Sequence, residues 1–250
     1  MSDLTGKTAV IIGASGTQSF GVASAKRLAA AGAKVVVSAR RKEQLEALAA
    51  EINGVAISCD ISDEAQVKAL FENAKAETGR VDIAVNCAGQ LAAAPISMLT
   101  TELIQPTLDV SFTGALLFFR YAAENMTGGG SIVTISSLTA RLPGPALAVY
   151  SAARAGIDYA VKVAALEYGP QKIRFNSIAA GLIHTDMTSA MFQDDATDNR
   201  FIPEIPLKRM GSVDDIAETV LYLADEKASG FVTGQLMDLS GGQHMGHLPN

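Results

Sequence analysis

The sequence predicts an α/β fold in which helices cover both faces of a doubly wound, Rossmann-like parallel sheet of about seven strands. Three observations support this prediction. Short β-branched, apolar runs alternate with longer alanine-rich runs along the chain. The short runs are apolar on both faces, as is typical of buried parallel strands. A glycine-rich turn follows the first of them, and right-handed βα repeats then build a doubly wound sheet.

The expected elements alternate from the N-terminus. Four strand-like runs are each followed by a helix-like run: 8–12 by 22–31, 34–38 by 43–52, 55–59 by 63–78, and 81–86 by 101–125. A further strand is expected over 131–135 and a helix from near Val149. Because no linker, low-complexity segment or repeat interrupts this pattern, we expect one dinucleotide-binding and catalytic domain over 1–250.

Composition and charge narrow the class of protein. The 250 residues are 48% hydrophobic and 18% charged, which is typical of a globular chain. The net charge is −6 and lysine and arginine form no block, so nothing indicates binding to nucleic acid or to an anionic membrane surface. No apolar run has the length of a membrane span, and the N-terminus does not resemble a signal peptide. We expect a cytoplasmic protein that acts on a small molecule.

The cysteines and histidines predict neither disulfides nor a metal site. Cys59 and Cys87 each end an apolar run, and two such thiols do not make a disulfide framework. The three histidines have no partners at metal-binding spacing, so no metal is expected; they are His184, His244 and His247.

The turn after the first strand is suited to binding a phosphate group. It reads GASGTQSFG from Gly13 to Gly21 and opens a helix. Glycines allow a tight turn and close approach of the backbone, and a helix N-terminus offers free N–H groups to a pyrophosphate. The spacing differs from the usual fingerprint, but its position after the first strand favours a cofactor. The predicted contacts are Gly13, Ser15, Ser19, Phe20 and Gly21.

The second strand ends in Arg40 and Arg41, where a dinucleotide fold usually meets the adenosine ribose. An acidic residue there accepts from a free 2′-hydroxyl, whereas arginine pairs with a 2′-phosphate. The sequence therefore favours NADP(H) over NAD(H). The alternative is that both arginines are solvated residues at the start of a helix.

Three polar groups are expected to converge after the strand at 131–135. Tyr150 and Arg154 are four residues apart, so they share one face of a helix, and the loop through Pro143 can fold Ser137 against them. A phenol has a pKa of about 10, which a nearby guanidinium lowers. A serine hydroxyl can donate to a substrate oxygen. These residues are candidate catalytic groups; alternatively, the tyrosine and arginine cap a buried helix.

The alternation weakens between Thr185 and Pro206. Apolar side chains there interleave with acidic ones: Met187, Met191, Phe192, Phe201 and Ile202 with Asp194, Asp195 and Asp198. We expect a substrate lid at about 186–208, with an ordinary pair of surface helices as the alternative. These aspartates and Asp186 are expected to face solvent, with contact to a cationic substrate as the alternative. The apolar side chains are expected to lie in the core or along an apolar substrate.

Several short motifs occur in one order along the chain. They are the turn at 13–21, Asp60-Ile61, Asn86-Cys-Ala-Gly89, Ser137, Tyr150, the run AGLIHT ending at Thr185, and the segments 206–211 and 230–242. Over essentially its full length the chain thereby resembles the short-chain dehydrogenase/reductases.

The resemblance implies a role for each matching position. On the adenosine side it implies contacts from Asp60, Ile61, Asn86, Ala88 and Gly89, and at the nicotinamide end from Ile183 and Thr185. It further implies that Ser137 binds the substrate carbonyl and that Tyr150 transfers the proton. A homotetramer or homodimer built on helix pairs, including the one that carries Tyr150, is also implied.

Three positions depart from the family pattern. The glycine turn has about two extra residues and resembles that of the enoyl reductase branch, which has a serine where Ser19 stands. That branch needs its lysine at the position of Ile157, so its activity is not expected. Ser111 replaces the asparagine that supports a relay water. Arg154 replaces the lysine, and arginine does not relay protons at neutral pH.

The Ser-Tyr-Arg spacing also resembles that of halohydrin dehalogenases, which expel halide without a cofactor. A catalytically reduced binding subunit is a further alternative. The arginine at 40, the aspartate at 60 and the Asn-x-Ala-Gly turn have no use in a dehalogenase. We therefore predict an NADP(H)-dependent oxidoreductase that interconverts a ketone or aldehyde with an alcohol, with Tyr150 as acid and base.

Overall fold

The computed structural model describes residues 2–189 and 201–246. Its centre is a seven-stranded sheet in the order β3-β2-β1-β4-β5-β6-β7, with every pairing parallel. The strands are β1 (Thr8–Ile12), β2 (Lys34–Ala39), β3 (Val55–Ser58), β4 (Ile83–Asn86), β5 (Gly130–Ser137), β6 (Ile173–Ala180) and β7 (Gln235–Leu239). The strand order reverses between β1 and β4, and such a reversal opens a crevice at the carboxyl ends of the strands.

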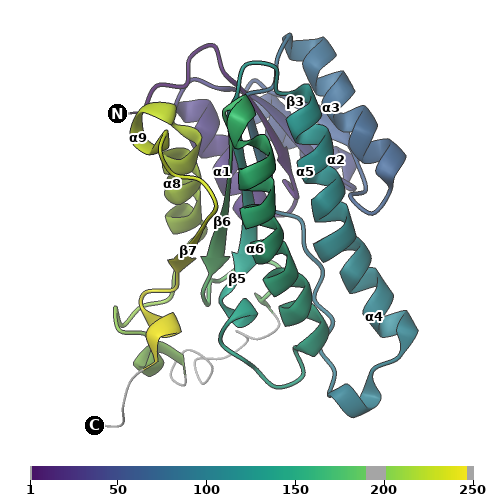
Figure 1. Ribbon diagram of the computed structural model, residues 1–250, viewed down its shortest axis with the longest axis vertical. Helices are drawn as coiled ribbons and strands as arrows, with labels where there is room; N and C mark the ends of the chain where they lie inside the picture. The colour runs from purple at the N-terminus through teal and green to yellow at the C-terminus, as the bar shows by residue number, and fades with distance from the viewer. Residues whose placement is uncertain (1, 190–200, 247–250) are drawn as a thin grey trace.

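Helices cover both faces of this sheet. They are α1 (Phe20–Ala30), α2 (Lys42–Glu51), α3 (Glu64–Thr78), α4 (Thr101–Leu108), α5 (Gly114–Asn125), α6 (Ala148–Tyr168), α8 (Val213–Ala224) and the short α9 (Glu226–Ser229). Figure 1 shows α5 and α6 in front of the sheet, and the arrows of β5, β6 and β7 point toward one edge of the molecule. Within the described residues, no helix combines the length and apolar character of a membrane span.

Two apolar cores separate these helices from the sheet. In β1, Ala9 and Ile11 belong to the core beneath α1, α2 and α8, whereas Val10 and Ile12 belong to the core beneath α3, α5 and α6. This alternation explains why the strands are continuously apolar, since both faces are covered. Burial of a side chain the size of Val10, Ile11 or Ile12 stabilises the fold by about 1.5–3 kcal/mol.

The segment expected as one helix over 101–125 contains a π turn. Helix α4 ends at Leu108, the π turn occupies Asp109–Thr113, and α5 then begins at Gly114. Pro106 lies inside α4 and cannot donate a backbone hydrogen bond. A side chain at Gly114 would meet the carbonyl oxygen of Ile61 at 2.5 Å. The π turn, a feature common at functional sites, holds the buried Ser111.

Candidate active site

The carboxyl edge of the sheet gathers most of the predicted site residues. Asn86 ends β4 and Ser137 ends β5, while the glycine turn and the run to Thr185 follow β1 and β6 directly. Strand β5 extends two residues beyond the expected 131–135, and this extension brings Ser137 to the edge. The four strands are consecutive neighbours in the sheet, so the loops after them border one crevice.

Arg154 lies at the centre of this edge. It is only 4% exposed, and its guanidinium donates to the carbonyl oxygens of Ile135 (3.1 Å) and Ala88 (3.3 Å). The guanidinium carbon lies 5.2 Å from the centre of the Tyr150 ring. Arg154 thus joins β5, the turn after β4 and the phenol on its own helix, and it brings a fixed positive charge to Tyr150.

Gly89 makes room for the guanidinium. A β-carbon at this position would collide with Nη2 of Arg154, which is the nitrogen that donates to Ala88. The planar fork of arginine therefore fits because residue 89 has no side chain. Sequence reasoning assigned Gly89 to the cofactor turn and missed this contact.

Ser137 is half-buried at the end of β5 and is held by the short turn η3 (Leu138–Ala140). Its Oγ accepts from the backbone N–H of Thr139 (3.2 Å) and lies 2.9 Å from the Thr139 hydroxyl. Sequence reasoning did not single out Thr139. The three expected catalytic residues thus belong to one edge, with Tyr150 stacked against Arg154 and Ser137 oriented by Thr139.

Asp158 is a second buried charge on α6, one turn after Arg154. It is 7% exposed, and its Oδ1 accepts from the Ser177 hydroxyl at 2.7 Å. Burial raises the pKa of Asp158 above its usual value, and the charge of Arg154 acts in the opposite direction. Sequence reasoning missed this residue, although an acid four positions after the arginine in an apolar helix was a visible signal.

The glycine turn packs tightly against its neighbours. Gly13 has a positive φ of 84°, and a β-carbon there would lie 2.6 Å from the carbonyl carbon of Cys87. Ser19 caps α1 by accepting from the N–H of Val22 at 3.2 Å. Phe20 packs against the core beneath α1. The turn after β1 therefore touches the turn after β4, as the predicted site requires.

The two arginines after β2 diverge. Arg41 donates to the Ser15 hydroxyl from Nε (3.3 Å) and Nη2 (3.0 Å), so it lies over the glycine turn. Arg40 is exposed and its charge acts on Asp60. Partial burial alone would raise the pKa of Asp60, but hydrogen bonds from Ser62 and the charge of Arg40 hold that pKa below its usual value.

The turn after β4 is stiffened from within. Asn86 is buried and accepts from the N–H of Ala88 at 3.0 Å, while its own Nδ2 has no hydrogen-bond partner among residues 2–189 and 201–246. Ser111 accepts from the N–H of Gln90 (3.1 Å) and donates to the Gln90 carbonyl (3.2 Å). Ile61 is buried beneath Gly114. The backbone of Gln90 thus uses the one proton that the Ser111 hydroxyl can donate.

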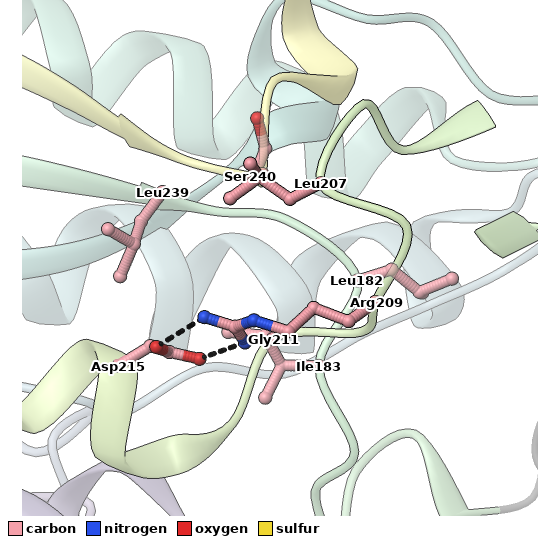
Figure 2. A pocket seen from close by; sticks show the side chains of 9 residues that line it. Leu182, Ile183, Leu207, Arg209, Gly211, Asp215, Leu239 and Ser240 are labelled. Atoms are coloured by element: carbon pink, nitrogen blue, oxygen red, sulfur yellow. Dashed lines mark hydrogen bonds and ion pairs between the residues drawn. The ribbon is translucent and has the colours of Figure 1, made fainter. Parts of the chain in front are cut away.

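Ile183 lines a small pocket at the ends of β6 and β7. The pocket has a volume of about 90 Å³, and Figure 2 shows Arg209 and Asp215 closing one side of it through two hydrogen bonds of 2.8 and 3.0 Å. The hydrogen bond from Arg209 lowers the pKa of Asp215 to about 2. Thr185 is buried and its N–H donates to the Thr188 hydroxyl at 2.9 Å.

The predicted lid is described only at its two ends, 186–189 and 201–208. Residues 201–208 include the short turn η6 (Ile202–Glu204). Five residues of the lid prediction lie outside the described ranges: Met191, Phe192, Asp194, Asp195 and Asp198. At the near end, the carboxylate of Asp186 reaches back to the glycine turn and accepts from the N–H of Thr17 at 2.8 Å.

The two thiols add no reactive group to the site, and the described residues form no cluster of metal ligands. Both cysteines are free, and burial raises the pKa of Cys59 and of Cys87 to about 12, so neither is a thiolate at neutral pH. Over residues 2–189 and 201–246, no three histidine, cysteine or acidic side chains gather as metal ligands would. His247 lies outside these ranges.

Comparisons with known proteins give consistent results. A family model described as enoyl-(acyl carrier protein) reductase matches residues 13–244. An uncharacterized oxidoreductase of Methylorubrum extorquens is 36% identical over 97% of this chain and 99% of its own length. A 3-oxoacyl-[acyl-carrier-protein] reductase of Synechocystis is 32% identical over 98% of this chain and all of its own. A short-chain type dehydrogenase/reductase from Mycobacterium ulcerans superposes with a TM-score of 0.93 and 30% identity, covering 100% of this chain and 94% of that one.

Proposed function

The chain belongs to the short-chain dehydrogenase/reductase family, and from this premise we propose that it interconverts a ketone or aldehyde with an alcohol using NADP(H). Two relatives bear the name 3-oxoacyl-[acyl-carrier-protein] reductase, that of an enzyme that reduces a carbonyl group. The observation that supports this proposal most is the position of Arg154. Its guanidinium ties the turn after β4 to β5 beside the Tyr150 phenol.

The residues at the crevice fit a dinucleotide. The glycine turn presents backbone N–H groups at the start of α1, and the absence of a β-carbon at Gly13 lets the turns after β1 and β4 meet. Within the described part of the chain, the buried Nδ2 of Asn86 has no acceptor, so it is an available donor in the turn after β4. When bound, the nicotinamide cofactor supplies or accepts the hydride.

The side chains of this chain supply the proton and the oxygen-binding groups. In the reducing direction, the Tyr150 hydroxyl gives its proton to the oxygen of the forming alkoxide. The Ser137 hydroxyl donates a hydrogen bond to the same oxygen and stabilises its developing charge. Arg154 then stabilises the tyrosine anion that remains.

The proton that Tyr150 loses has to return by a route other than Arg154. A guanidinium stays protonated at neutral pH, so it orients and stabilises but does not pass a proton on. The Ser111 hydroxyl does not provide this route either, because it donates its hydrogen bond to the Gln90 carbonyl. Because Tyr150 is only half-buried, we propose that solvent reprotonates it directly.

Arg40 and Arg41 favour NADP(H). Both follow β2 and both are exposed, so a 2′-phosphate near the end of this strand meets two cations. Arg41 in addition joins this region to Ser15 of the glycine turn. Ser15, Arg40 and Arg41 are therefore the proposed determinants of cofactor choice.

The substrate itself is not assigned. The family model that matches carries the name of an enoyl reductase, but the position at which that branch needs a lysine is Ile157, which is fully buried in the core beneath α6. We therefore propose reduction of a carbonyl group rather than of a carbon–carbon double bond.

We also propose a homotetramer or homodimer in the cytoplasm. Apolar side chains are exposed along α5 and α6, among them Leu116, Tyr159 (69% exposed), Val163 and Leu166 (80% exposed). Such a surface favours an interface between helices of two copies. The free cysteines favour a reducing compartment. Light scattering on the purified protein tests the oligomer.

A direct test mixes the purified protein with NADPH and then with a panel of ketones and aldehydes. We expect nucleotide fluorescence to change on binding and NADPH absorbance to fall with at least one carbonyl compound. Absence of NADPH and NADH binding by calorimetry would defeat the proposal.

The Ser-Tyr-Arg grouping makes a cofactor-independent dehalogenase the second candidate, because a buried arginine beside the tyrosine serves alkoxide formation equally well. Halide release from a vicinal haloalcohol without nucleotide would establish this second activity. If neither activity is found, the remaining alternative is that the chain is a catalytically reduced binding subunit.

A further inference from the structure

The glycine turn holds a carboxylate from the same chain. Asp186 follows β6 and is exposed, and its two oxygens accept hydrogen bonds from three donors of the turn. The backbone N–H of Thr17 donates at 2.8 Å, the Thr17 hydroxyl at 3.0 Å and the backbone N–H of Gln18 at 3.2 Å. In return, the N–H of Asp186 donates to the carbonyl of Gln18 at 3.0 Å.

The turn is shaped to accept this anion. Gly16 has a positive φ of 106°, and a β-carbon at Gly16 would collide with Oδ2 of Asp186. The N–H of Gly16 donates to Gln44 at 2.8 Å, so three consecutive backbone N–H groups each meet a side-chain oxygen. Successive backbone N–H groups in such a turn form an anion-binding concavity. Asp186 and Gln44 fill it.

Thr17 and Gln18 lie between Ser15 and Ser19, two of the predicted cofactor contacts, in the glycine turn that the proposed function places against the cofactor pyrophosphate; on that function the following inference rests. Each N–H has one proton to donate, so a phosphate oxygen and the Asp186 carboxylate cannot both take it in full. Two anions at one site also repel each other. We infer that Asp186 sets the affinity for the nucleotide by competing with its pyrophosphate for Thr17 and Gln18.

The competition links the two ends of the cofactor site. Asp186 directly follows Thr185, whose side chain contacts Thr188 and which the family resemblance places at the nicotinamide end. When phosphate replaces the carboxylate, the segment 185–189 loses the hydrogen bonds that Asp186 accepts from three donors of the glycine turn. Nucleotide binding is therefore coupled to release of this segment.

The size of the effect follows from the fraction of molecules in which the turn is free. The apparent dissociation constant is the intrinsic constant divided by that fraction. If Asp186 occupies the turn in about nine molecules of ten, its removal tightens binding about tenfold, which corresponds to about 1.4 kcal/mol.

The test compares Asp186→Ala and Asp186→Asn with the wild-type protein by nucleotide fluorescence and calorimetry. Asp186 is exposed, so both variants should fold. We expect the dissociation constant for NADPH to fall about tenfold in Asp186→Ala and by less in Asp186→Asn, whose amide oxygen can still accept. ADP should show the same tightening, because it carries the pyrophosphate without the nicotinamide. Adenosine should show none.

The matched control is Asp214→Asn. Asp214 is exposed in the first turn of α8, and its replacement changes the net charge from −6 to −5, as Asp186→Asn does. We expect no change in nucleotide affinity in this control. Amide hydrogen exchange gives a second readout: the N–H groups of Thr17 and Gln18 should exchange faster in Asp186→Ala than in the free wild-type protein.

The outcomes separate this inference from the proposed function. Unchanged or weaker binding of NADPH and ADP in Asp186→Ala, with binding intact in the wild type, overturns the inference and leaves the function standing. Tighter ADP binding without turnover of any carbonyl compound supports the inference and defeats the redox function. Failure of wild type and variants alike to bind NADPH, NADH and ADP overturns both.

Discussion

The two ends of the proposed cofactor crevice are built in opposite ways. At the catalytic end, Arg154 is buried and bonded to backbone carbonyls of β5 and of the turn after β4. At the phosphate end, Arg41 and Asp186 are exposed. Their hydrogen bonds hold the glycine turn, and water can take the place of either side chain in these bonds. Buried hydrogen bonds are costly to lose, whereas exposed ones exchange with water at little cost. The catalytic end is therefore fixed, and the phosphate end is adjustable.

The largest effect is expected at the catalytic end from Tyr150→Phe. Loss of the acid should lower turnover of a ketone about a hundred- to ten-thousand-fold. The dissociation constant for NADPH should stay the same, because the phosphate end is untouched. Initial rates and fluorescence titration measure the two quantities separately. Retained turnover would reject Tyr150 as the acid.

A matched pair of arginine substitutions compares the stability of the two ends. Arg154→Met leaves the carbonyls of Ile135 and Ala88 without their donor, and the loss of such a buried partner costs about 1–3 kcal/mol. Arg41→Met removes an exposed contact with Ser15 and should change the free energy of unfolding by less than about 0.5 kcal/mol. Urea denaturation of both variants measures this difference. Equal losses would remove the contrast between the two ends.

Only substitutions at the phosphate end should change the preference between NADPH and NADH. We expect Arg41→Ala to lower the preference for NADPH over NADH about five- to tenfold, because one charge-assisted contact at an exposed site is lost. Arg40→Ala separates the two arginines, since Arg40 lies near Asp60 rather than over the turn. The ratio of the two dissociation constants is the measurement. An unaltered ratio in both variants would exclude these arginines as determinants.

The smallest effect is expected in the pH dependence of the free energy of unfolding, through Asp158. Burial raises the pKa of this group in the folded protein above its unfolded value of about 3.9. Its favourable contribution is therefore complete below that value and is lost as pH rises through the folded pKa. Asp158→Asn keeps the neutral form at every pH, so its stability relative to the wild type should increase from pH 4 toward neutrality. A pH-independent difference would contradict this assignment.

The sequence predicted the sheet well because its strands are buried on both faces. The continuous apolar runs at 8–12 and 34–38 coincide with β1 and all but the last residue of β2. The π turn at Asp109–Thr113 was not predicted, and Gly114, which follows it, packs against Ile61 on a distant segment. Local periodicity carries no information about such a contact.

The candidate site was predictable in its residue types but not in its contacts. Ser137, Tyr150 and Arg154 were recognisable from spacing and family resemblance. Asp186 was expected only to face solvent, and the structure places its carboxylate on Thr17, 169 residues earlier in the chain. Arg41 was expected to meet a phosphate, and in the free protein it also binds Ser15. Contacts between loops at a sheet edge follow from strand order, which no single loop encodes.

Gly89 and Arg154 restrict the order in which substitutions can accumulate. A β-carbon at 89 would collide with the Nη2 group that Ala88 and the packing around it hold in place. Replacement of Arg154 by the narrower lysine does not require any change at 89. Replacement of Gly89 while Arg154 is present displaces the guanidinium from its carbonyl partner. A lineage or a directed-evolution campaign can therefore change position 154 first, whereas the reverse order passes through a damaged intermediate.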